Sequence, residues 1–135
     1  KLFPFTKEIL TELKDKQYKM ILVSNKPEYY VKKIIQHFNI NHFFCAVSGG
    51  DTFKYRKPNP KHLYETIKLT GNKFSNCIFI GDSISDALCA KNSNSKLILL
   101  KHGYSDIDIN SMKADIVLDD LKMIPYSVSK LKFDN

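Results

Sequence analysis

The sequence predicts an α/β fold in which helices cover both faces of a parallel sheet. Short, continuous apolar runs at residues 20–23 and 77–80 are typical of strands that are buried on both faces of such a sheet. The segments between the runs carry apolar residues at helical spacing and are long enough for the right-handed crossovers that join parallel strands. This alternation indicates a three-layer, Rossmann-like arrangement. The 135 residues, 43% of them hydrophobic, are enough for one domain with a real core.

The first half of the chain contains two expected helices and two expected strands. Apolar residues recur at helical spacing over residues 6–16 and again over residues 28–38. The apolar run at residues 20–23 separates these helices, and residues 43–47 form a second strand. A loop with glycines and prolines follows, and its prolines exclude a helix before Pro60.

The second half begins with a helix, because Asn59 is a good cap residue and Pro60 suits a first helical turn. That helix stops at Gly71. The remaining expected elements are, in order, a strand at 77–80, a helix at 83–92, a strand at 96–100, a turn at His102-Gly103-Tyr104, a strand at 116–118, and a final helix over about residues 121–131 that Pro125 kinks or restarts.

The positive charge of the chain is the first observation that bears on partners. A net charge of +7 is compatible with a nucleic-acid partner. However, Arg56 is the only arginine, and the other cations are lysines spread along the chain. Arginine is the residue usually recruited for bidentate contacts with phosphates and bases. The composition therefore disfavours nucleic-acid binding.

The cysteines and the hydropathy pattern predict a cytoplasmic protein. Cys45, Cys77 and Cys89 are an odd number and show no C-x-x-C spacing, which favours free thiols in a reducing compartment. No apolar run approaches the roughly 20 residues that a membrane-spanning helix needs. The chain also opens without the pattern of a signal peptide. We therefore expect no membrane contact.

Two carboxylates follow the strand at residues 77–80. Asp82 comes directly after Gly81, and Asp86 follows four residues later, a spacing that places two side chains on one face of a helix. Ligands of open α/β sheets bind beyond the carboxyl ends of the strands. Two carboxylates there favour a hard cation, Mg²⁺ before others. Alternatively, Asp82 could cap the next helix and Asp86 could match its dipole, and the cap and metal roles of Asp82 are compatible.

Three further polar residues are expected at the same edge of the sheet. The Ser24 hydroxyl and free backbone N–H groups near Asn25 could donate to phosphoryl oxygens. Lys57 could neutralise charge on the phosphoryl group, and Mg²⁺ could clamp the same oxygens. Taken singly, Ser24 could belong to an ordinary turn and Lys57 could be a solvated loop charge. Pro58 and Pro60 favour a lysine that is held in place.

Three motifs occur in a fixed order: I-L-V-S-N-K at residues 21–26, K-P-N-P at 57–60 and G-D-S-I-S-D at 81–86. Together they resemble the haloacid dehalogenase superfamily, and most closely its phosphoglycolate phosphatase-like branch, over nearly the whole chain to about Leu121. The resemblance implies Mg²⁺-dependent hydrolysis of a small phosphorylated metabolite through an aspartyl-phosphate. It also implies these roles: phosphoryl binding by Ser24 and Asn25, charge stabilisation by Lys57, Mg²⁺ ligation by Asp82, and ligation of Mg²⁺ or its waters by Asp86.

The first motif of the superfamily, D-x-D-G-[TS], supplies the nucleophile, and it is missing here. The nearest string, Asp106-Ile107-Asp108, has no strand before it and no Gly-Thr after it, and we interpret it as a solvated loop or helix start. The cap domain that sets substrate choice is also missing. We therefore expect residues 1–135 to be a partial hydrolase core that lacks the first-motif strand. The strands that end at Ser24 and Asp82 would then meet directly or leave a gap.

A second hypothesis stays open beside the phosphatase. The chain could be a non-catalytic module of the same fold that binds a phosphorylated ligand or a partner protein. An upstream in-frame segment with the first motif and a helical cap would exclude this alternative.

Overall fold

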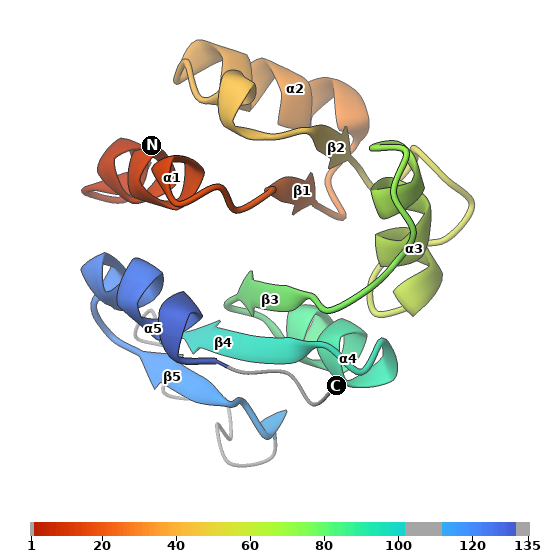
Figure 1. Cartoon of the computed structure of the whole chain (residues 1–135). Coiled ribbons are helices and arrows are strands. Elements are labelled where there is room, and N and C mark those ends of the chain that lie inside the picture. The colour runs from red at the N-terminus through yellow and green to blue at the C-terminus, as the bar shows by residue number, and fades with distance from the viewer. Residues whose placement is uncertain (1, 102–111, 132–135) are drawn as a thin grey trace.

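The computed structural model describes residues 2–101 and 112–131, and all strands in this part of the chain are parallel. They form two separate sheets (Figure 1). β1 (Ile21–Val23) pairs with β2 (Ala46–Ser48) in one sheet. β3 (Ile78–Gly81), β4 (Lys96–Leu100) and β5 (Ile116–Leu118) form the other sheet, in that order. The predicted parallel α/β architecture is confirmed.

The helices surround these two sheets. They are α1 (Thr6–Asp15), α2 (Glu28–His37), α3 (Pro60–Lys68), α4 (Ile84–Asn92) and α5 (Ile124–Lys130), with short 3₁₀ helices η1 (Asn41–Phe43) and η3 (Leu121–Met123). Figure 1 shows α3 at the side of the molecule, where it reaches from the β1–β2 sheet to α4. Across the described residues, no helix has the length and apolar character that crossing a membrane requires.

The core lies on both faces of the β3–β4–β5 sheet. On one face, Phe79 and Leu97 pack with apolar residues of α3 and α4. On the other face, Ile98 is fully buried among apolar residues of α1 and α5. The alternation of Leu97 and Ile98 between the two faces follows from the two-residue period of a strand. These clusters confirm the predicted layers of helix, sheet and helix.

Some boundaries differ from the predicted ones. β2 begins at Ala46 because η1 occupies Asn41–Phe43, where the sequence pattern predicted the start of the strand. Pro125 restarts the last helix, as predicted, since it lies in the first turn of α5 directly after η3. The expected turn at residues 102–104 and the D-I-D string at 106–108 lie outside the described residues.

The two sheets are not joined by backbone pairing, because β1 and β3 do not pair with each other. Side chains connect them instead: Ile21 and Val23 of β1 pack against the cluster that contains Leu63 and Phe79. The sequence left two arrangements open, direct pairing of these strands or a gap between them. Direct pairing is absent. The end of β1 still lies near the end of β3, and this proximity brings the polar residues of the two strand ends together.

The three cysteines are free thiols, as predicted. Cys89 is buried, Cys77 is half-buried and Cys45 is exposed. Burial raises the pKa of the Cys89 thiol to about 11, so this group stays protonated at neutral pH. Burial also raises the pKa of Cys77. The cytoplasmic location that the cysteine count predicts stays a prediction.

Candidate functional site

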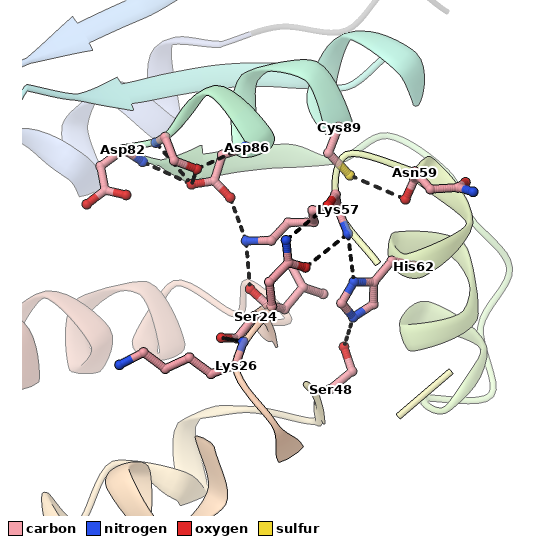
Figure 2. A network of polar contacts seen from close by, with 12 residues as sticks. Ser24, Lys26, Ser48, Lys57, Asn59, His62, Asp82, Asp86 and Cys89 are labelled. Carbon is pink, nitrogen blue, oxygen red and sulfur yellow. Dashed lines mark hydrogen bonds and ion pairs between the residues drawn. The ribbon is translucent and has the colours of Figure 1, made fainter. Parts of the chain in front are cut away.

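Lys57 and Asp86 form the centre of the candidate site. Lys57 lies in the loop between β2 and α3, and Asp86 lies in the first turn of α4. The Lys57 Nζ lies 2.6 Å from Asp86 Oδ1, and the two side chains are only 11% and 9% exposed (Figure 2). A charge that is removed from water to this degree requires a partner, so the pair fixes both side chains.

The ammonium of Lys57 also reaches the first sheet. It donates to the backbone carbonyl of Val23, the last residue of β1, over 3.3 Å. Lys57 therefore links the end of β1 to α4 at the place where the two sheets have no backbone pairing. An ammonium has three N–H groups. Within the described residues two of them have oxygen acceptors, the third has none, and Nζ also lies 6.0 Å from the centre of the Phe79 ring.

Asn25 holds the backbone of Lys57. Its Nδ2 donates to the Lys57 carbonyl over 2.9 Å, and its Oδ1 accepts from the Lys57 N–H over 3.0 Å. Both ends of the amide are therefore engaged with one residue. The backbone N–H of Asn25 has no partner in the described part of the chain, and the role of Asn25 in phosphoryl binding stays a prediction.

The loop after β2 supports the loop that carries Asn25. The Gly50 N–H donates to the carbonyl of Lys26 over 2.7 Å, and Asp51 Oδ1 accepts from the N–H of Glu28 at the start of α2. A Cβ atom at Gly50 would overlap the backbone carbonyl of Asn25. The close approach of these loops therefore requires glycine at this position.

Ser24 is half-buried at the end of β1. Its N–H donates to the carbonyl of Ser48 over 3.1 Å, which extends the pairing of β1 with β2. Its Oγ accepts from the N–H of Lys26 over 3.1 Å. The Ser24 hydroxyl proton has no acceptor among residues 2–101 and 112–131, so this group can donate to an oxygen of a bound anion.

The carboxylate of Asp86 organises the start of α4. Its Oδ2 accepts from the N–H groups of Asp82 and Ser83 and from the Ser83 hydroxyl, over 2.9–3.2 Å. Ser83 Oγ in turn accepts from the Asp86 N–H, which completes a capping box. The cap of α4 is therefore Ser83, and the alternative in which Asp82 caps this helix is wrong. A Cβ atom at Gly81 would overlap the Asp86 carboxylate, which explains the glycine before Asp82.

Asp82 and Asp86 do not share one helix face, contrary to the expectation from their spacing. The reason is that α4 begins only at Ile84, so Asp82 lies in the preceding turn. Figure 2 shows the Asp82 carboxylate to one side of the Lys57–Asp86 pair. It is half-buried and has no partner among the described residues, so its oxygens are available to a cation. No cluster of three or more metal-ligating side chains occurs in this part of the chain.

A buried polar network that the sequence motifs did not reveal lies behind Lys57. His62, Ser48 and Thr66 are all fully buried. His62 Nδ1 accepts from the Lys57 N–H over 3.2 Å, and His62 Nε2 lies 2.9 Å from Ser48 Oγ (Figure 2). Burial, followed by the charge of Lys57, lowers the pKa of His62. The sequence signal for this network is the four-residue spacing of His62 and Thr66 on the face of α3 that carries Leu63.

Comparisons with known proteins agree with these motifs. The sequence profile of haloacid dehalogenase-like hydrolases matches residues 1–100. The chain is 36% identical over 124 residues to a phosphoglycolate phosphatase of Pasteurella multocida, which covers 91% of this chain and 55% of that protein. It is 37% identical over 121 residues to a phosphoglycolate phosphatase of Vibrio parahaemolyticus, which covers 89% of this chain and 53% of that protein.

A solved structure shares the fold. The crystal structure of a predicted phosphoglycolate phosphatase from Haemophilus somnus superposes with a TM-score of 0.86 at 32% identity, over 95% of this chain and 57% of that chain. The chain thus spans about half the length of the relatives it matches. The matched residues include all three motifs that contribute to the site, from Ser24 to Asp86. The chain therefore belongs to the haloacid dehalogenase-like hydrolase family.

Proposed function

We propose that this chain is the C-terminal portion of a Mg²⁺-dependent phosphatase that hydrolyses a small phosphomonoester of the phosphoglycolate type. In this proposal an aspartyl-phosphate forms on a nucleophile that lies outside the 135 residues. One observation carries the proposal: unengaged donors on Ser24 and Lys57 and an unengaged carboxylate on Asp82 adjoin the buried Lys57–Asp86 pair. Donors for a phosphoryl group and oxygen ligands for a cation are thus combined at one edge.

The proposed roles follow from the groups that are free to act. The Ser24 hydroxyl and the Asn25 backbone N–H donate to phosphoryl oxygens. The third N–H of Lys57 stabilises negative charge that develops on the same group. Asp82 and Asp86 offer the hard oxygen donors that suit Mg²⁺, and when bound this ion would neutralise charge on the phosphoryl oxygens.

The test compares this chain with the longer reading frame that contains it. We expect the pure 135-residue chain to show no Mg²⁺-dependent hydrolysis of phosphoglycolate or of an aryl phosphate. The longer protein should hydrolyse one of them, and Lys57→Met or Asp82→Asn should reduce its kcat by about 100-fold or more. Turnover by the short chain alone would refute the external nucleophile. A longer protein with no D-x-D-G-T segment and no turnover would favour the non-catalytic module.

A further inference from the structure

We propose that His62 is a positioning residue for Lys57. In this view His62 Nδ1 holds the backbone N–H of Lys57, and Ser48 and Thr66 fix the imidazole in one tautomer. The inference rests on the proposed function, because the position of Lys57 matters for catalysis only if its ammonium faces a phosphoryl group. It adds a buried network on β2 and α3 to the residues that the sequence motifs supply.

The direction of the hydrogen bonds can be derived from the Lys57 end. The backbone N–H of Lys57 can only donate, so His62 Nδ1 must accept and carries no proton. A neutral imidazole with an unprotonated Nδ1 carries its proton on Nε2. The Nε2–H therefore donates to Ser48 Oγ over 2.9 Å.

The same direction follows independently from the other end. The Thr66 hydroxyl donates to the carbonyl of His62 over 2.7 Å, so its oxygen is left to accept from Ser48, also over 2.7 Å. Ser48 must then donate to Thr66 and accept from His62 Nε2. Both derivations give one arrangement of protons, in which every polar hydrogen has an acceptor. Such a complete network rigidifies its members.

The network is built for a neutral imidazole. All three side chains are fully buried, and burial followed by the Lys57 charge lowers the pKa of His62, against a smaller opposite effect of a hydrogen bond with the Gly49 backbone. A second proton, on Nδ1, would point at the Lys57 N–H and break the contact. The neutral state thus preserves the acceptor for Lys57, whose N–H is shared between Asn25 Oδ1 and His62 Nδ1.

Two side chains, those of Asn25 and His62, therefore hold the Lys57 backbone, and they differ in burial and in the element that carries them. Asn25 is exposed and belongs to the loop after β1, whereas His62 is buried and belongs to α3. The contact of Lys57 Nζ with Asp86 spans 2.6 Å, and the position of the lysine backbone helps to set where the ammonium meets the carboxylate. Loss of the His62 contact should let the ammonium leave Asp86.

The first experiment uses the unmodified chain. Heteronuclear NMR of the imidazole nitrogens at neutral pH should show His62 with an unprotonated Nδ1 and a protonated Nε2, without averaging between tautomers. A protonated Nδ1, or a rapidly exchanging mixture, overturns the proposal. This measurement uses the unmodified chain, so its outcome does not depend on whether a substituted variant folds.

The second experiment separates positioning from packing by two amide substitutions. His62→Asn places its amide near the Nδ1 position and can keep the acceptor for Lys57. His62→Gln reaches the Nε2 position and removes that acceptor. The readouts are the NMR signal of the Lys57 ammonium and its rate of acylation by an amine-reactive ester. We expect acylation of Lys57 about tenfold faster in His62→Gln, equivalent to about 1.4 kcal/mol, and a rate close to that of the unmodified chain in His62→Asn.

Equal acylation rates in the two variants overturn the positioning role. A failure of the proposed function would look different: the longer protein would then lack phosphatase activity, while the His62 tautomer and the Lys57 acylation rates would be as expected. If instead the longer protein is an active phosphatase and the two variants do not differ, only the role of His62 fails.

Discussion

Removing one partner of the buried Lys57–Asp86 ion pair should destabilise the chain more than removing one partner of an exposed pair among the described residues. Removing one partner of a buried pair leaves an uncompensated charge, at a cost of about 3–5 kcal/mol. We therefore expect Lys57→Met to lower the free energy of unfolding by about 3 kcal/mol in urea denaturation. Lys32→Met breaks an exposed pair with Glu28, 58% and 35% exposed, and is the matched control at less than about 1 kcal/mol. Equal losses in both variants would contradict the burial argument.

Lys57 and Mg²⁺ should compete for the same carboxylate. In Lys57→Met the Asp86 carboxylate loses its cation, while the Asp82 carboxylate remains available nearby. Because a ligand that binds only the folded state stabilises it, millimolar Mg²⁺ should raise the Tm of Lys57→Met more than that of the unmodified chain. The control is the double variant with Asp82→Asn, which should lose most of this response. Identical Tm shifts with and without Asp82 would argue against a metal role for that residue.

His62 should make the stability of the chain depend on pH. Burial, with a contribution from the Lys57 charge, lowers its pKa below the ordinary value of 6.5, whereas the unfolded chain retains that value. The unfolded state therefore binds more protons in acid. The stabilisation is complete above about pH 6.5 and is lost as the pH falls toward the lowered pKa of the folded state.

The measurement is urea denaturation at about pH 7.5 and about pH 5.5. The unmodified chain should lose more stability between these values than His62→Asn, because the amide of asparagine does not titrate. The other histidines are common to both chains, so the difference isolates His62. The same pH dependence in both chains would show that His62 does not bind fewer protons when the chain is folded.

At the scale of the element, the start of α4 depends on its capping box. The Ser83 side chain accepts from the Asp86 N–H and donates to Asp86 Oδ2. Ser83→Ala should cost about 1 kcal/mol in urea denaturation, the usual value for a lost N-cap. Ser129→Ala is the matched control, since its exposed hydroxyl donates to the carbonyl of Tyr126 and caps no helix start, and it should cost less than about 0.5 kcal/mol. Similar losses would mean that the box does not stabilise α4.

The order of the elements could be predicted from the sequence because apolar period and cap residues are local signals. The run at residues 77–80 largely corresponds to β3, Asn59 caps α3, and Pro125 lies in the first turn of α5. The four-residue spacing of Asp82 and Asp86 gave a wrong prediction of a shared helix face. Residues at this spacing share a face only if both lie within the helix, and α4 begins after Asp82. The K-P-N-P motif identified Lys57. Its contacts with Asp86 and His62 join a loop to two helices, and the periodicity of a sequence does not predict such tertiary contacts.

At the scale of the whole molecule, the main feature to explain is that the strand edges of β1 and β3 that face each other are unpaired in the described part of the chain. Neither edge pairs with a described strand, and within residues 2–101 and 112–131 side chains such as those of Val23, Phe79 and Lys57 connect the two sheets. Unpaired backbone groups on a strand edge must be satisfied by water or by another strand. In the proposed function the nucleophile would lie on a segment outside the 135 residues, and a strand of that segment would pair with these two edges.

Hydrogen exchange can test this arrangement residue by residue. In the 135-residue chain, amides of β1 and β3 should exchange much faster than those of β4, which pairs on both sides and contains the fully buried Ile98. In the longer protein, a strand inserted between β1 and β3 should slow their exchange by about tenfold or more and leave β4 unchanged. β4 is therefore the internal reference for global stability. If β1 and β3 already exchange as slowly as β4 in the short chain, side-chain packing alone closes the gap, and no inserted strand is needed to complete the fold.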